Sequence, residues 1–206
     1  MKQDLIIVGA GGHALSCIDV IEQQSKFSIA GLVGLENEIG TIVNGYKVIA
    51  TDSELPELAK IYPSALISVG QIKNVDLRIT LFQKCAQVGF SMATVISPNA
   101  YVSPYAQIGE GSIIMHGVII NSSAKIGKNC IINSRSLIEH GSIVGDNTHI
   151  STGVIVNGDV TIGANCFIGS GSIVKESISI GSDCLIGMGQ IIRKNIEKKM
   201  TISESI

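Results

Sequence analysis

The sequence of 206 residues has no long apolar run, no excess of one charge and no paired-cysteine motif. No apolar stretch reaches the roughly 18 residues that cross a bilayer. Lys and Arg number 15 against 17 Asp and Glu, so a net charge of −2 offers no broad surface for nucleic acid or an anionic membrane. The five cysteines form no CxxC motif, which argues against a disulfide framework and a tetrahedral zinc site. We therefore expect a small-molecule partner and no metal, nucleic acid or membrane. The start MKQDLIIVGAGG has no cleavage pattern of a signal peptide, so we expect a cytoplasmic protein.

A hydrophobic period of six runs through the second half of the chain. Every sixth residue from Ile96 to Ile192 is Ile or Val. Neither a helix nor a single strand repeats at six, so each hexapeptide is expected to form a short strand and a corner of a parallel β-helix. Glycine recurs every 18 residues, at Gly109, Gly127, Gly145, Gly163 and Gly181. Three hexapeptides then make one triangular coil, and we expect these glycines to adopt a positive φ at a tight corner.

Three of the cysteines follow the same register. Cys130, Cys166 and Cys184 each lie four residues after a repeat isoleucine, where a small inward side chain is expected. We interpret them as structural.

Residues 5–96 follow a different pattern, in which strands and helices alternate. Strands are expected at LIIVG, IAGLV, YKVIA, ALISVG and MATVI, and helices at ALSCIDVIEQQ, DSELPELAKI and NVDLRITLFQKCAQV. Parallel strands need crossover connections, and the helices supply them. We therefore expect a Rossmann-like α/β domain over residues 1–94, followed directly by an all-β domain over residues 95–206.

The repeats IGEGSI, IGKNCI, IGANCF and IGSDCL resemble those of the hexapeptide-repeat acyltransferases, whose coils form a left-handed parallel β-helix. The segments GAGGHA, SVGQ, ISPNAYV and INSRSLIEHGSIVGDNTHIS narrow the resemblance to the bacterial nucleotide-amino-sugar and sialic-acid acetyltransferases. This resemblance implies a homotrimer whose N-terminal domain binds a nucleotide sugar and whose β-helix uses acetyl-CoA as co-substrate. The implied reaction is N- or O-acetylation of a nucleotide-activated amino sugar or a sialic-acid-like sugar, in bacterial surface glycan biosynthesis.

The resemblance also implies roles for particular residues. His140, in the IEH segment, corresponds to the general base that removes a proton from the attacking amine or hydroxyl. His149 is expected to contact the carbonyl region of acetyl-CoA, and the backbone amide of Gly158 to position the same group. Asn133 corresponds to a polar residue on the substrate side.

The spacing of 18 supports part of this assignment. His140 lies 18 residues before Gly158 and 18 after Ser122, so the three should stack on one corner with rungs about 4.8 Å apart. Asn133 and Ser151 are related in the same way and should form a second polar corner, where a pantetheine arm could lie close to the backbone. The residues that we assign to acetyl-CoA are therefore His149, Ser151, Gly158, Ser170 and Gly187.

Gly141 is a departure from the family pattern. Family members usually carry Asp or Glu directly after the catalytic histidine, where the acid orients the imidazole. The base could then be oriented by another residue, by a neighbouring subunit or by water, or the enzyme could be slow or inactive. The alternative function is a non-catalytic trimer that binds a nucleotide sugar or a partner protein. His116 should occupy a different corner from His140, which favours a structural or substrate-side role.

The loop GAGGHA fits G-x-G-x-x-A between a strand and a helix, a pattern typical of a phosphate-binding turn. We assign Gly11, Gly12 and His13 to the phosphate or sugar end of the substrate, with Gly70 and Gln71 at the end of a neighbouring strand. Only Glu36 lies near the end of the second strand, so the acidic residue that binds NAD is missing and NAD is disfavoured.

Overall fold

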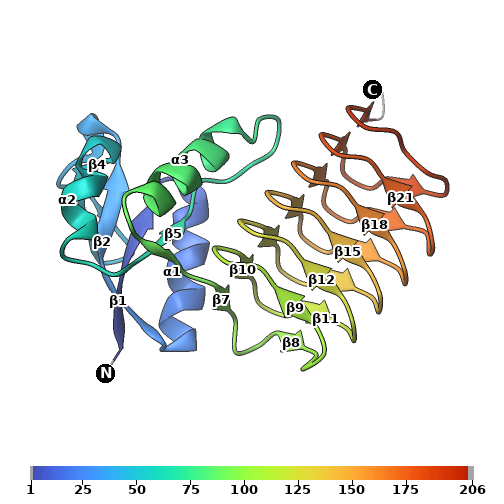
Figure 1. Ribbon diagram of the computed structural model, residues 1–206, viewed down its shortest axis with the longest axis horizontal. Coiled ribbons are helices and arrows are strands. Elements are labelled where there is room, and N and C mark those ends of the chain that lie inside the picture. The colour runs from blue at the N-terminus through green and yellow to red at the C-terminus, as the bar shows by residue number, and fades with distance from the viewer. Residues whose placement is uncertain (1, 204–206) are drawn as a thin grey trace.

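The computed structural model describes residues 2–203, which form an α/β domain and a stack of triangular coils leading away from it (Figure 1). One sheet has the strand order β3-β4-β2-β1-β5-β6. Its strands are β1 (Gln3–Val8), β2 (Phe27–Gly34), β3 (Ile42–Val43), β4 (Tyr46–Thr51), β5 (Ser64–Ile67) and β6 (Ser91–Met92). All neighbours are parallel except β3 and β4, a short antiparallel pair at the edge. The expected parallel α/β sheet is confirmed, including β4 at YKVIA, and the edge strand β3 is an addition that the sequence did not indicate.

The helices cover both faces of this sheet. They are α1 (Gly12–Gln24), α2 (Leu55–Ala59) and α3 (Asp76–Gln87), with 3₁₀ turns η1 (Glu36–Glu38) and η2 (Asp52–Glu54). Alternate residues of β1 face opposite ways, so Leu5 and Ile7 join the core cluster that contains α1, whereas Ile6 and Val8 join the one that contains residues of α2 and α3.

The helix expected over DSELPELAKI is interrupted. The structure has the turn η2 followed by the short helix α2, with a proline in the first turn of α2. Proline lacks the backbone N–H and fits only the first turn, so Pro56 fixes where α2 begins.

The expected strand MATVI is divided between the two domains. Met92 ends β6 in the first sheet, whereas Val95 and Ile96 form β7, the first strand of the coils. The domains share one core cluster, in which Val95 and the buried side of α1 belong together with the interior of the coils.

The coils are built from two-residue strands, each ending on an expected Ile or Val. They are β7 (Val95–Ile96), β8 (Tyr101–Val102), β9 (Gln107–Ile108), β10 (Ile113–Ile114), β11 (Ile119–Ile120), β12 (Lys125–Ile126), β13 (Ile131–Ile132), β14 (Leu137–Ile138), β15 (Ile143–Val144), β16 (His149–Ile150), β17 (Ile155–Val156), β18 (Thr161–Ile162), β19 (Phe167–Ile168), β20 (Ile173–Val174), β21 (Ser179–Ile180), β22 (Leu185–Ile186) and β23 (Ile191–Ile192). A final strand, β24 (Thr201–Ile202), pairs with β22 outside the six-residue register. The left-handed parallel β-helix expected from the repeats is confirmed.

Three parallel sheets form the faces of this prism. Face 1 contains β7, β10, β13, β16, β19, β22 and β24; face 2 contains β8, β11, β14, β17, β20 and β23; face 3 contains β9, β12, β15, β18 and β21. We call the turns from face 1 to face 2 corner A, from face 2 to face 3 corner B, and from face 3 to face 1 corner C. The N-terminal domain packs on face 1, where Gln71 and His149 meet.

The explanation expected for the glycines spaced by 18 is wrong. None of Gly109, Gly127, Gly145, Gly163 and Gly181 is among the residues with positive φ. They are glycines because the next coil passes too close for a side chain. A Cβ on Gly145, for example, would lie 2.6 Å from the backbone nitrogen of Ala164 and from the carbonyl carbon of Gly163.

Positive φ occurs instead at another point of each hexapeptide. Every sixth residue from Gly111 to Gly189 has φ between 54° and 70°. Gly, Asn, Asp and Ser hold almost all of these positions, as the left-handed region favours. Gly141 is one of them, with φ of 69°.

A ladder of side-chain amides stabilises corner C. Asn129 donates to Asn147, Asn147 to Asn165 and Asn165 to Asp183, with distances of 2.9, 3.1 and 2.9 Å. The nearby cysteines Cys130, Cys166 and Cys184 are free and buried, as expected. Among residues 2–203, no helix is long and apolar enough to span a membrane.

Candidate active site

The glycine loop lies where a parallel α/β sheet binds ligands. Strands β2 and β5 flank β1 on opposite sides, so the carboxyl end of β1 is the point where the strand order reverses. The loop from Gly9 to Gly12 leaves β1 there and enters α1. Gly9 needs to be glycine, with φ of 119° and the Ser68 hydroxyl 2.9 Å from an added Cβ. Gly11 and Gly12 have open space at the Cβ position.

A cavity of about 360 Å³ opens at this edge of the sheet. Its lining is mostly apolar and includes Gly11, Val33, Gly34 and Leu77. The volume is in the range of small-molecule sites. The structure therefore brings one predicted residue, Gly11, to a cavity at the predicted edge.

Two carboxylates that the sequence interpretation missed line the same cavity. Glu38 turns back over Gly34 and accepts a hydrogen bond from the amide of Leu35 at 2.8 Å, and Asp52 follows directly after β4. Glu36, the only acid considered near this strand, is not among the lining residues. The sequence did contain a signal for Asp52, which is an acidic residue directly after a parallel strand. It contained none for Glu38, because the turn η1 that brings this side chain back to the cavity is visible only in the structure.

His13 and Gln71 lie on the other side of the loop, between the two domains. Gln71 is 4% exposed and donates from its side chain to the carbonyl oxygen of Cys166 at 3.2 Å. Burial lowers the pKa of His13 to about 3, helped by the charge of Arg78. The buried Nε2 of His13 and Oε1 of Gln71 have no hydrogen-bond partner among the described residues. The two residues expected at the phosphate or sugar end thus form part of the interdomain contact.

His149 meets this contact from face 1. Its Nδ1 lies 2.6 Å from the carbonyl oxygen of Gln71, and because a carbonyl only accepts, Nδ1 carries the proton. Burial lowers the pKa of His149 to about 4, so the imidazole is neutral near pH 7 and its Nε2 is an acceptor. Nε2 faces the side-chain amide of Asn133 at 3.4 Å. His149 therefore presents a lone pair at Nε2, not a hydrogen-bond donor.

Arg78 holds the segment that carries Gln71. It is 1% exposed, and its guanidinium donates to the carbonyl oxygens of Ile67 and Val69 at the end of β5 and to that of Asn129 in the β-helix. Burial lowers its pKa to about 10. Arg78 thus bridges the two domains beside the predicted substrate residues, a role that the sequence interpretation missed.

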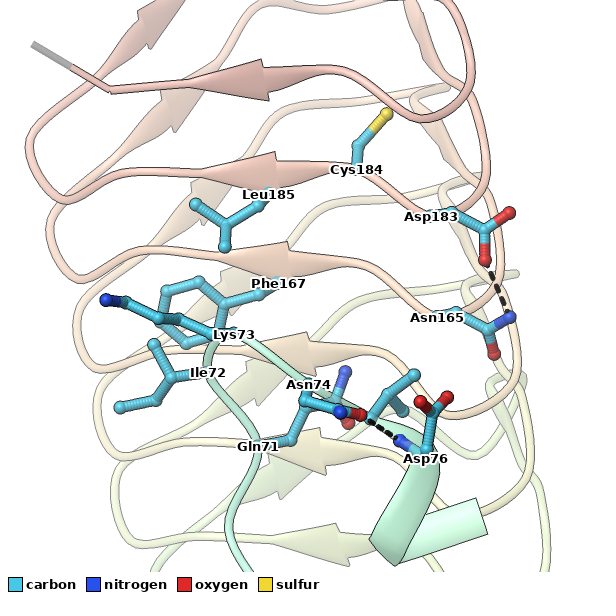
Figure 2. A pocket seen from close by; sticks show the side chains of 11 residues that line it. Gln71, Ile72, Lys73, Asn74, Asp76, Asn165, Phe167, Asp183, Cys184 and Leu185 are labelled. Carbon is cyan, nitrogen blue, oxygen red and sulfur yellow. Dashed lines mark hydrogen bonds between the residues drawn. The ribbon is translucent and has the colours of Figure 1, made fainter.

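A second cavity, of about 280 Å³, is lined by residues of both domains, among them Gln71 and Phe167 (Figure 2). The segment from Gln71 to Asp76 forms one wall, and Asn165, Phe167 and Leu185 of the β-helix form another. The ring of Phe167 meets that of His149 edge to face, with centroids 5.2 Å apart. The contact between the two domains is therefore open beside Gln71, which lines this cavity.

His140 lies on corner B, at the opposite edge of face 2 from corner A. The predicted stacking with Gly158 is present, since a Cβ on Gly158 would lie 2.7 Å from Cε1 and 2.9 Å from Nε2 of His140. The stacking with Ser122 is present too, as Gly141 donates to the carbonyl oxygen of Ser122 at 3.1 Å. His140 is exposed, and within residues 2–203 no side chain is hydrogen-bonded to its ring. The imidazole is therefore free to bind a reacting group.

The residues assigned to acetyl-CoA divide between two places. Ser151 and Ser170 share a hydrogen bond of 2.9 Å on corner A, where Asn133 and Gly187 also lie. Gly158 lies on corner B. One chain therefore brings His149 to Asn133 and brings His140 to Gly158, but it does not bring the two pairs together.

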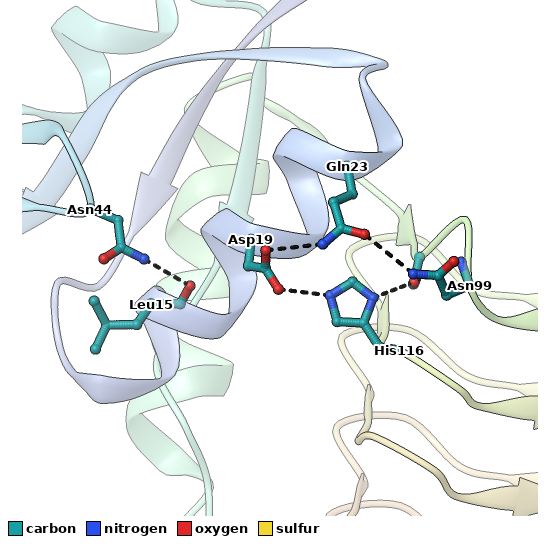
Figure 3. Close-up of polar contacts among 7 residues, drawn as sticks. Leu15, Asp19, Gln23, Asn44, Asn99 and His116 are labelled. Carbon is teal, nitrogen blue, oxygen red and sulfur yellow. Dashed lines mark hydrogen bonds and ion pairs between the residues drawn. The ribbon is translucent and has the colours of Figure 1, made fainter.

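His116 connects the domains. Its Nε2 lies 2.9 Å from Asp19 in α1 and its Nδ1 2.6 Å from the hydroxyl of Ser97 (Figure 3). The hydrogen bond with His116 lowers the pKa of Asp19. His116 lies on corner A, whereas His140 lies on corner B, as the spacing of the two residues predicted. No group of three or more His, Cys, Asp or Glu that could hold a metal ion occurs within the described chain.

The chain combines a Rossmann-like domain with a left-handed β-helix, and His140 and His149 lie on the β-helix. This architecture is typical of the bacterial hexapeptide transferases. Residues 4–84 match the PglD N-terminal domain family, residues 123–158 and 141–176 the bacterial transferase hexapeptide family, and residues 159–194 the hexapeptide repeat of succinyl-transferase. A PglD-type N-terminal match is thus followed along the chain by hexapeptide-repeat matches, and these repeats confirm the resemblance that the sequence indicated.

Solved structures of similar proteins cover almost the whole chain. A perosamine N-acetyltransferase from Caulobacter crescentus, in complex with CoA and GDP-perosamine, is 28% identical with a TM-score of 0.90 over 98% of this chain and 93% of that one. The acetyltransferase domain of PglB from Neisseria gonorrhoeae, in complex with acetyl coenzyme A, is 27% identical with a TM-score of 0.89 over 98% and 96%.

A curated relative covers a smaller region. The UDP-N-acetylbacillosamine N-acetyltransferase of Bacillus subtilis is 30% identical over 114 residues, which are 55% of this chain and 51% of the relative. The chain thus matches about half of that protein's length.

Proposed function

We propose that this protein transfers the acetyl group of acetyl-CoA to the amine of a nucleotide-activated amino sugar. The observation that carries the proposal is the similarity over 98% of the chain to an N-acetyltransferase in complex with CoA and GDP-perosamine. The relative from Bacillus subtilis is also named as an N-acetyltransferase, which favours transfer to nitrogen over transfer to oxygen. We assign the reaction to glycan biosynthesis, and the expected cytoplasmic location is part of the same proposal.

The division of the site between two corners supports a homotrimer. The outward residues of face 2 form an apolar stripe, one residue per coil: Tyr101, Ile119, Leu137, Ile155, Ile173 and Ile191. Several of them are exposed in the single chain, and an exposed apolar stripe favours a protein partner. If face 2 of three copies turns toward a common axis, corner B of one copy meets corner A of the next, because a cyclic assembly joins two different edges of the same surface. His140 of one subunit would then approach Asn133 and Ser151 of its neighbour.

In the proposed reaction His140 is the general base. The sugar amine adds to the thioester carbonyl as His140 removes a proton from its nitrogen, and the carbon–sulfur bond breaks as the proton passes to the CoA sulfur. The products are the acetamido sugar and CoA with a free thiol. The backbone amide of Gly158, which has no hydrogen-bond acceptor in the described part of the chain, is placed to stabilise the oxyanion. His149, as an acceptor at Nε2, would contact acetyl-CoA without donating to that oxygen.

The nucleotide end is assigned to the cavity at the carboxyl end of β1. Gly11 and Gly12 begin α1, whose N-terminal amides favour phosphate. Gly70 and Gln71 lead from this cavity toward the one beside His149, so the sugar would extend along them. We also propose that the two domains divide between residues 94 and 95. The sheet of the N-terminal domain ends with β6 at Met92, and the β-helix begins with β7 at Val95.

Free thiol release from acetyl-CoA, measured with UDP-, GDP- and CMP-linked amino sugars and their hydroxyl analogues, tests the function. We expect release with an amino sugar and a kcat at least about 100-fold lower in His140→Ala. His116→Ala is the matched control, since it removes a histidine at another corner, and it should keep most of the rate. Binding of a nucleotide sugar without CoA release from any acceptor would favour the alternative, a non-catalytic trimeric binding protein.

A further inference from the structure

Corner B contains a reciprocal packing of two side chains on two glycines. The ring of His140 lies over Gly158 in the next coil, and the carboxylate of Asp159 lies over Gly141 in the coil before. A Cβ on Gly141 would collide with Oδ1 of Asp159. The backbone fixes the pairing, since the amide of Asp159 donates to the carbonyl oxygen of His140 at 2.9 Å.

This packing puts a carboxylate beside His140 from the neighbouring coil. His140 precedes Gly141 and Asp159 follows Gly158, so the two side chains leave adjacent columns of the stack and cross the same gap between coils. Gly141 and Asp159 both have positive φ, of 69° and 58°. Asp and Gly are both compatible with such positions, so the acid can occupy either one.

The other charged groups near this corner are less well placed. Glu139 turns toward the preceding coil, where it accepts hydrogen bonds from the Asn121 amide at 2.9 Å and from the backbone amide of His140 at 3.2 Å. Glu176 lies 36 residues beyond His140 and therefore two coils away, and it is exposed. Asp159 is the carboxylate of the adjacent coil.

We infer that Asp159 is the positioning residue for His140, supplying from the next coil the acidic group that Gly141 cannot carry. This inference rests on the proposed acetyl transfer. The Asp159 carboxylate orients the imidazole and stabilises the positive charge that His140 gains on taking the proton from the sugar amine. Coulomb attraction between a carboxylate and a protonated imidazole does not need a direct hydrogen bond.

Asp159→Asn tests the inference in the full-length protein. We expect kcat to fall at least about tenfold while KM for acetyl-CoA and for the nucleotide sugar stays near the parent values, because Asp159 is assigned a role toward the base and none toward either substrate. Moving the acid by combining Gly141→Asp with Asp159→Gly should restore most of the lost rate. Glu176→Gln, which neutralises an exposed acid on the same corner two coils from His140, is the matched control and should leave kcat unchanged. An unchanged kcat in Asp159→Asn, or a loss that the relocated acid does not rescue, overturns the inference.

A second measurement is independent of turnover. The ring resonances of His140, identified by their loss in His140→Ala, should shift in Asp159→Asn at neutral pH, and those of His116 should not. Identical His140 resonances in Asp159→Asn and the parent protein also overturn the inference. The proposed function fails separately, when the parent protein releases no CoA with any acceptor.

Discussion

Nδ1 of His149 donates a hydrogen bond of 2.6 Å to the carbonyl oxygen of Gln71, which joins the β-helix to the segment that follows β5. This bond fixes the neutral tautomer with Nε2 as an acceptor. The interdomain contact therefore contains two neutral histidines, His149 and His13, both with a pKa well below the usual value of about 6.5.

We expect the stability of the protein to fall as the pH drops below 6.5. The unfolded chain binds protons at both histidines there, whereas the folded protein does not until about pH 4 at His149 and about pH 3 at His13. Each histidine should lower the free energy of unfolding by about 1.4 kcal/mol per pH unit below 6.5, and neither contributes above it. Denaturant unfolding between pH 7 and pH 5, above the range of most carboxylates, measures the effect. His149→Gln should halve the slope, and an equal slope in that variant contradicts the prediction.

The two classes of glycine should respond differently to substitution. Gly145→Ala places a Cβ against the backbone of the next coil and should lower the free energy of unfolding by about 2 kcal/mol. Gly153→Asn has open space and a φ of 67° that asparagine tolerates, so its effect should stay within about 0.5 kcal/mol. Equilibrium unfolding of both variants is the measurement. Equal losses would mean that backbone conformation, not the approach of the next coil, selects glycine at both positions.

A charge on the apolar stripe of face 2 should prevent assembly. Ile155→Glu places a carboxylate at the centre of the stripe, where burial against another subunit would leave it unpaired. We expect a monomer by light scattering and loss of CoA release, because corners A and B would no longer meet. Thr161→Glu, on the exposed side of face 3, is the control and should keep the parent mass. A trimer that persists in Ile155→Glu excludes face 2 as the interface.

Gly11→Val should block the nucleotide end of the site. Gly11 has φ of −80°, which valine can adopt, and no atom lies within 4 Å of its Cβ position, so the side chain would enter the cavity without straining the fold. We expect nucleotide-sugar affinity, measured by calorimetry, to fall at least about tenfold with the melting temperature near that of the parent. Parent-like affinity would place the nucleotide elsewhere.

The six-residue register shows how far local pattern reaches in this protein. Each repeat Ile or Val points into the prism because the spacing allows no other regular structure, and the expected strands were confirmed one by one. The same arithmetic placed His140 over Gly158 and separated His116 from both. The six-residue register did not explain why residue 145 is glycine. Glycine can be required because the next coil passes close by or because the backbone has a positive φ, and the sequence shows the same residue in both cases.

The sequence by itself determined the β-helix, its corners and the glycine loop after β1, since these follow from periodicity and from the backbone preferences of single residues. Only the tertiary structure decided what lies across the gaps between distant segments. It placed His13 and Gln71 in the interdomain contact and Glu38 over the end of β2. It also brought the carboxylate of Asp159 over Gly141, the residue that follows His140. These contacts depend on side-chain directions and on the packing of one domain on the other, which no spacing along the chain specifies.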